Sequence, residues 1–136
     1  MKKLFALSLS LLMMVSCSSA QKEIQVGALS FDEYLPLLEG KRVSILSNQT
    51  GMVSSTTHLL DTLLDMGVNV VSIMSPEHGF RGVADAGEHV SSSIDPDTGI
   101  PIRSLYESGV NRPSDESMAE FDVMVFDLQD VGVRFY

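Results

Sequence analysis

Apolar runs alternate with amphipathic stretches along the chain, and this alternation predicts an α/β fold. Residues 43–46, 68–74 and 121–127 are mostly apolar and often β-branched, which is typical of strands buried in a parallel sheet. Between the first two runs, leucines recur at helical spacing over residues 55–66. A helix between two parallel strands makes a right-handed crossover the expected connection.

Shorter elements are predicted around these strands. Residues 30–39 are expected to form a short helix, because Ser30 and Glu33 have the spacing of a capping box. A short strand is predicted at 101–106, and a short acidic helix at 113–120.

The predicted helix over residues 55–66 has a clear end. Gly67 suits the position just after a helix, where φ is positive. His58 falls in the first turns of this helix and is expected to be a solvated side chain. Further along, residues 79–99 are rich in Gly, Ser and Asp and predict a long irregular segment, of the kind that is often functional.

The first 20 residues have the features of a bacterial secretory signal. Two lysines precede an apolar run over 4–15, which is too short to span a bilayer comfortably. Cys17, the only cysteine, ends a stretch at 14–17 that is similar to a lipobox, so it is the candidate lipid attachment site of a membrane-anchored lipoprotein. The small residues at 18–20 would instead suit cleavage to a soluble periplasmic form.

The remaining residues divide into a linker at 21–29 and one domain at 30–136. The domain is expected to be incomplete, because no covering helix follows the strand at 121–127. Removing the signal, which carries two lysines and no acid, changes the net charge from −9 to −11. Such an acidic chain is not expected to bind nucleic acid, and local arginines would have to meet any anionic ligand.

Polar side chains gather after the predicted strands. Residues 75–82 bring a proline, an acid, a histidine, two glycines and an arginine together, and residues 47–51 and 127–134 follow two other strands. Ligands of open α/β sheets bind beyond the carboxyl ends of the strands, so these loops form a candidate site. The alternative is that their polar residues only cap and solvate turns.

Other chemistries fit the sequence poorly. Glu77-His78 and Glu88-His89 are adjacent pairs without the H-E-x-x-H spacing, so no metal is expected. The glycines form neither a dinucleotide fingerprint nor a P-loop, so no nucleotide cofactor is expected. No serine lies in a G-x-S-x-G elbow.

Five segments together resemble one family, the NamZ-type exo-β-N-acetylmuramidases, formerly a bacterial domain of unknown function. They occur in the family's order and cover the chain from about Gly27 to its end. Five linked motifs are far more specific than any one of them. The segments are 47–51, 75–82, 85–88, 98–101 with 104–106, and 126–136.

The resemblance implies a Rossmann-like, mostly parallel sheet with flanking helices, followed in the family by a second domain. It places the active site in the cleft between the two domains, and this chain resembles only the first part. The implied activity is removal of terminal N-acetylmuramic acid from the non-reducing end of peptidoglycan fragments, without a cofactor.

Carried over by motif, Glu77 is the leading candidate for the catalytic acid. Glycoside hydrolysis commonly needs one carboxyl group to protonate the leaving oxygen and a second group at the anomeric carbon. Asp127 and Asp130 are candidates for the second role, or for raising the pKa of Glu77, although either could merely cap a turn. His78 is expected to orient a carboxylate or a substrate hydroxyl. Assistance by the substrate's own acetamido group stays open.

N-acetylmuramic acid carries a lactyl carboxylate, which guanidinium groups bind well. Arg81 and Arg134 lie in two of the candidate loops and could make this contact, with a surface ion pair as the alternative. Asn48 and Gln129 suit sugar hydroxyls or the acetamido group, although turn formation explains Asn48 nearly as well. The rival function is non-catalytic binding of peptidoglycan fragments, and a third is another amino-sugar specificity on the same scaffold.

Overall fold

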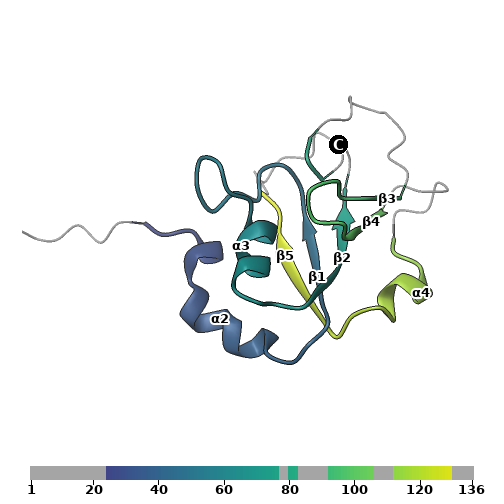
Figure 1. Ribbon diagram of the computed structural model, residues 1–136, viewed down its shortest axis with the longest axis horizontal. Helices are drawn as coiled ribbons and strands as arrows, with labels where there is room; N and C mark the ends of the chain where they lie inside the picture. The colour runs from purple at the N-terminus through teal and green to yellow at the C-terminus, as the bar shows by residue number, and fades with distance from the viewer. Residues whose placement is uncertain (1–23, 77–79, 83–91, 106–111, 130–136) are drawn as a thin grey trace, which may run out of the picture.

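The protein is built on one five-stranded, mostly parallel sheet (Figure 1). The computed structural model describes residues 24–76, 80–82, 92–105 and 112–129. The strands are β1 (Val43–Ser47), β2 (Val70–Ser75), β3 (Ser93–Ile94), β4 (Pro101–Ser104) and β5 (Val123–Asp127). Their order is β3-β4-β2-β1-β5, and only β3 is antiparallel to its neighbour. The predicted fold class is confirmed, whereas β3 lies in the stretch expected to be irregular.

Short helices flank this sheet. They are η2 (Gly27–Leu29), α2 (Phe31–Leu38), α3 (Leu59–Asp65) and α4 (Asp115–Met118). The helix α3 connects β1 to β2 and lies over the sheet in Figure 1. Within the described ranges, no helix is long and apolar enough to cross a membrane.

The helix α3 begins at Leu59, four residues later than the leucine spacing predicted. The hydroxyl oxygen of Ser54 accepts hydrogen bonds from the N–H groups of Thr56 and Thr57, at 3.2 and 3.0 Å. Serine side chains that bond to nearby backbone compete with helix formation, so the residues before His58 form a turn instead.

The C-terminal end of α3 agrees with the prediction from the sequence. Gly67 has a φ of 79°. Its N–H donates to the carbonyl of Leu64 and the N–H of Val68 donates to the carbonyl of Leu63, both at 2.9 Å. This pair of bonds is a Schellman motif, which satisfies the last carbonyls of the helix and turns the chain toward β2.

Ser30 precedes α2 but does not cap it through its side chain, so the predicted capping box is wrong. Its φ of −82° and ψ of 52° differ from the extended conformation that aims an N-cap oxygen at the helix. The chain enters α2 directly from η2, and the Ser30 N–H donates to the carbonyl of Gly27 at 3.0 Å. A second bond, from the Tyr34 hydroxyl to the carbonyl of Ala28 at 2.8 Å, ties η2 to α2.

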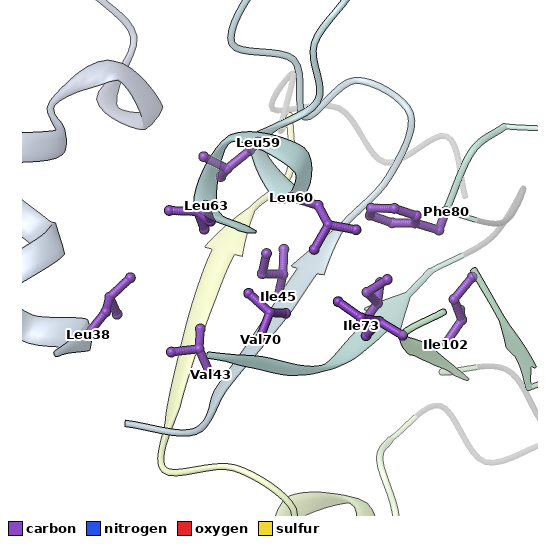
Figure 2. Packing of buried hydrophobic residues seen from close by; sticks show 11 residues of the cluster. Leu38, Val43, Ile45, Leu59, Leu60, Leu63, Val70, Ile73, Phe80 and Ile102 are labelled. Atoms are coloured by element: carbon purple, nitrogen blue, oxygen red, sulfur yellow. The ribbon is translucent and has the colours of Figure 1, made fainter. Parts of the chain in front are cut away.

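The hydrophobic core lies between α3 and the sheet (Figure 2). Buried leucines of α3 face buried side chains of β1 and β2: Leu59, Leu60 and Leu63 against Ile45, Val70 and Ile73. The β1–β2 register shifts after Val43, which leaves Val71 without a partner, and both Val70 and Ile73 then belong to the core. This packing holds the first turn of α3 near the carboxyl end of β1.

Candidate functional site

The carboxyl ends of β1, β2 and β5 lie together at one edge of the sheet, because these strands are parallel neighbours. In this register Ser47 pairs with Asp127, so the loop after β1 starts beside that carboxylate. The predicted site residues that the structure describes are Asn48, Arg81, Asp127 and Gln129. Those that lie outside the described residues are Glu77, His78, Asp130, Arg134 and the candidate lipid site Cys17.

Asn48 shapes the loop after β1. Its Oδ1 accepts hydrogen bonds from the N–H of Thr50 at 2.9 Å and from the hydroxyl of Thr50 at 2.7 Å. Its backbone carbonyl accepts the N–H of Gly51 at 3.1 Å. The amide oxygen of Asn48 therefore stabilises the turn, which was the alternative role considered for this residue from the sequence. Its Nδ2 group, a donor, is the part of the side chain available for a ligand.

Gly51 lies where three polar side chains come together. A Cβ built on it would be 3.0 Å from Asp127 Oδ2 and 3.0 Å from His58 Nε2, and would collide with the hydroxyl of Ser47. Only a residue without a side chain fits this space. Burial, and then the nearby negative charge of Asp127, raise the pKa of Tyr34. The carboxylate of Asp127 therefore lies close to Gly51 of the β1 loop and influences Tyr34 of α2.

His58 is buried, so the expectation of a solvated side chain is wrong; only 3% of it is exposed. It is the N-cap of α3, and its Nδ1 accepts the N–H of Leu60 at 3.1 Å. Its Nε2 lies 2.8 Å from the carbonyl oxygen of Asn48, and its ring packs edge-on against Phe80 at 4.6 Å between centroids. The sequence does contain one signal for this capping role, because His58 lies directly before Leu59, the first leucine of the helical pattern.

The segment after β2 packs against the loop after β1. Phe80 is 2% exposed and joins the core beside Leu60 (Figure 2). Gly82 has a φ of 71°, and a Cβ built on it would lie 2.9 Å from both Cβ and Cγ of Gln49. The two loops are therefore in contact, and Gln49 was not among the residues predicted from the sequence.

Arg81 belongs to a network of carboxylates. Its guanidinium donates to both oxygens of Asp95, at 3.0 and 2.9 Å, and to those of Asp61, at 3.2 and 3.4 Å. Asp95 is fully buried. This arrangement favours the ion-pair alternative for Arg81, with one partner buried rather than at the surface. Contact between Arg81 and a lactyl carboxylate stays a prediction.

The network shifts the pKa values of both partners. Hydrogen bonding to Asp95 is the main cause that raises the pKa of Arg81. Burial alone would raise the pKa of Asp95, but hydrogen bonds from Arg81 and Thr98 outweigh it and hold this pKa below its usual value. Both groups are therefore charged at neutral pH, which keeps the segment around Arg81 fixed to the turn that follows β3.

A cleft of about 650 Å³ runs along β5. Its lining includes the polar side chains of Tyr34, Thr50, Asp127 and Gln129, and much of the rest is apolar, including Leu37 of α2 and Val125 of β5. Within the described part of the chain, no three His, Cys, Asp or Glu side chains are grouped as metal ligands would be. A largely apolar cleft with a few polar groups is the usual form of a site for a small organic ligand.

A mostly parallel sheet with flanking helices is an α/β fold of Rossmann-like type. The amide of Asn48 and the carboxylate of Asp127 lie at the carboxyl edge of this sheet, which is the candidate site. Residues 43–136 match the family described as "Exo-beta-N-acetylmuramidase NamZ, N-terminal". The chain belongs to this family, as its motifs predicted.

Individual relatives agree with this assignment. The chain is 39% identical over 105 residues to peptidoglycan beta-N-acetylmuramidase NamZ of Bacillus subtilis strain 168, a match that covers 76% of this chain and 25% of the relative. Crystal structures of two DUF1343 family proteins of Bacteroides fragilis NCTC 9343 share the fold. One has a TM-score of 0.67 at 46% identity, covering 84% of this chain and 28% of its own. The other has a TM-score of 0.62 at 36% identity, covering 74% and 24%. The chain thus spans about a quarter of the length of these relatives.

Proposed function

We propose that this chain is the N-terminal part of a peptidoglycan exo-β-N-acetylmuramidase, which releases terminal N-acetylmuramic acid from non-reducing ends. Membership of the NamZ family carries the proposal. Support comes from the convergence of the loops after β1, β2 and β5, which holds Asn48 and Asp127 at the edge from which the Glu77 segment departs.

The proposed chemistry divides between two acidic groups and a set of binding groups. Glu77 protonates the oxygen of the leaving sugar, with His78 orienting a carboxylate or a substrate hydroxyl. Asp127 or Asp130 acts at the anomeric carbon or raises the pKa of Glu77. The proposed binding residues for the hydroxyls, the acetamido group and the lactyl carboxylate are Asn48, Gln129, Arg134 and Arg81.

A hydrolysis assay tests this function. The protein expressed from its whole reading frame is incubated with a chromogenic β-N-acetylmuramide and with the matching β-N-acetylglucosaminide, which lacks the lactyl group. We expect turnover of the first and little of the second. Turnover of the glucosaminide alone would replace the substrate assignment, and hydrolysis of neither would reject the enzymatic proposal.

The second candidate is a non-catalytic binder of peptidoglycan fragments. It is favoured by the cleft along β5, because a lining that includes Thr50, Asp127 and Gln129 can hold an amino sugar whether or not the sugar is cleaved. Calorimetry with an N-acetylmuramic acid-terminated disaccharide separates the two candidates. Binding without release of sugar by the whole protein would favour the binder.

We also propose that the protein is exported and anchored through a lipid on Cys17, and so acts on wall fragments outside the cytoplasm. The signal-like sequence of residues 1–20 supports this. Cells grown with radioactive palmitate should yield labelled protein, and the Cys17→Ala variant should yield none. Equal label in the two would reject lipidation at this residue.

A further inference from the structure

Building on the proposed muramidase function, we infer that His58 is a positioning residue of the site. It fixes the loop after β1 and thereby aligns Asn48 and the edge that carries Asp127. His58 touches no reacting group in this scheme and acts through the backbone of the loop. The inference depends on one hydrogen bond at each ring nitrogen and on the packing of the ring against Phe80.

The first step is the state of the ring. The partner of Nε2 is the carbonyl oxygen of Asn48, at 2.8 Å, so Nε2 must carry a hydrogen and donate. The partner of Nδ1 is the N–H of Leu60, at 3.1 Å, so Nδ1 must accept. These partners together fix a neutral imidazole with its hydrogen on Nε2.

The second step is what the ring connects. His58 contacts three separate segments of the chain. They are the loop after β1 through Asn48, the first turn of α3 through Leu60, and the segment after β2 through Phe80. It is almost fully buried, so its bonds are shielded from water. The ring therefore holds the Asn48 loop in a fixed position relative to α3 and the sheet.

The third step is the closeness of the ring to Asp127. A Cβ built on Gly51 would be 3.0 Å from both His58 Nε2 and Asp127 Oδ2. Gly51 also donates its N–H to Asn48 and accepts the N–H of Leu59 at 2.8 Å. Loss of the Nε2 bond would release the Asn48 carbonyl from α3 while Gly51 stays bonded to Leu59, so the Asn48 turn could shift relative to Asp127. Displacements of about 1 Å near a reacting centre can cost on the order of a hundredfold in rate.

Two substitutions separate positioning from helix capping. In His58→Asn, the amide oxygen takes the place of Nδ1 and can still cap α3, since asparagine is a strong N-cap residue, but no donor reaches Asn48. In His58→Gln, the longer side chain places its NH₂ near the former Nε2 and can restore the bond to Asn48, while the cap is lost. A residue that only caps would tolerate His58→Asn and suffer from His58→Gln.

The experiment measures kcat and KM on the β-N-acetylmuramide for both variants of the whole protein, with circular dichroism to confirm folding. We expect kcat to fall about tenfold or more in His58→Asn and to stay within about threefold of the wild type in His58→Gln. Equal activities, or the reverse order, would overturn the positioning role.

Nuclear magnetic resonance of the wild type keeps the inference testable if a variant does not fold. The long-range ¹H–¹⁵N spectrum should show His58 with its hydrogen on Nε2 and in slow exchange with water. A hydrogen on Nδ1, or a rapidly exchanging ring, would overturn the inference. Absence of muramide hydrolysis by the wild type would count against the proposed function instead, and the amide exchange of residues 48–51 in His58→Asn would then decide whether the ring holds the loop.

Discussion

Arg81 shows how one side chain in a motif can serve either chemistry or structure. The sequence left two roles open, a substrate carboxylate or an ion pair, because both need the same guanidinium. The structure gives it a bidentate contact with buried Asp95, 14 residues further along the chain. That partner lies in a stretch without periodicity, so no local pattern could have indicated the pairing.

Replacing Arg81 should therefore cost stability. In Arg81→Met the Asp95 carboxylate would stay buried without its main partner, and we expect a loss of about 3 kcal/mol in the free energy of unfolding. The matched control is Arg103→Met, whose bidentate pair with Glu120 is about one-third exposed and should cost less than about 1 kcal/mol. Urea denaturation measures both, and equal losses would contradict the role given to Asp95.

The same network predicts acid sensitivity. The pKa of Asp95 is lower in the folded protein than its usual value, so its contribution to stability is complete above the unfolded pKa of about 3.9 and is lost as the pH falls below it. Asp122 adds a loss in the same direction, because hydrogen bonds from Arg42 lower its pKa to about 2. Urea midpoints between pH 6 and pH 3 should fall, and fall less steeply in Asp95→Asn. An equal slope in that variant would show that Asp95 contributes nothing.

At the scale of elements, the sequence predicted β1, β2 and β5 to within two residues at each end, because apolar runs between polar loops are a strong signal. It predicted the end of α3 from Gly67, whose φ is positive. It predicted where α2 begins but not how that end is capped, and it placed the start of α3 four residues too early. Side chains of Ser30 and Ser54 can bond to backbone in several local geometries, and the surrounding chain decides which one forms.

Glycines at two loops provide a test at this scale. Gly67 and Gly82 both have a positive φ, but a Cβ at Gly67 would meet nothing within 4 Å, whereas a Cβ at Gly82 would press on Gln49. Gly67→Ala should cost about 1 kcal/mol of stability from strain alone. Gly82→Ala should cost more, and Gln49→Ala in the same chain should recover part of the difference. Equal costs for the two single variants would contradict the contact between the loops.

At the scale of the whole molecule, parallel strands place several loops at one edge, and this much followed from the sequence. The contacts among those loops did not. Asn48, His58 and Phe80 meet because α3 packs on β1 and β2 and so brings its N-terminus to the edge. Such long-range packing depends on the complete three-dimensional arrangement, and spacing along the chain does not reveal it.

The central claim is that this edge belongs to a muramidase in which Glu77 donates a proton to the leaving group. It is tested most directly by the dependence of the Glu77→Gln variant on its substrate. An aryl leaving group such as dinitrophenolate needs no proton, whereas a sugar leaving group does. We predict that the variant loses about a hundredfold or more in kcat on the disaccharide and much less on the dinitrophenyl muramide. An equal loss on both substrates, or no loss on either, would contradict the assignment of Glu77 as the proton donor.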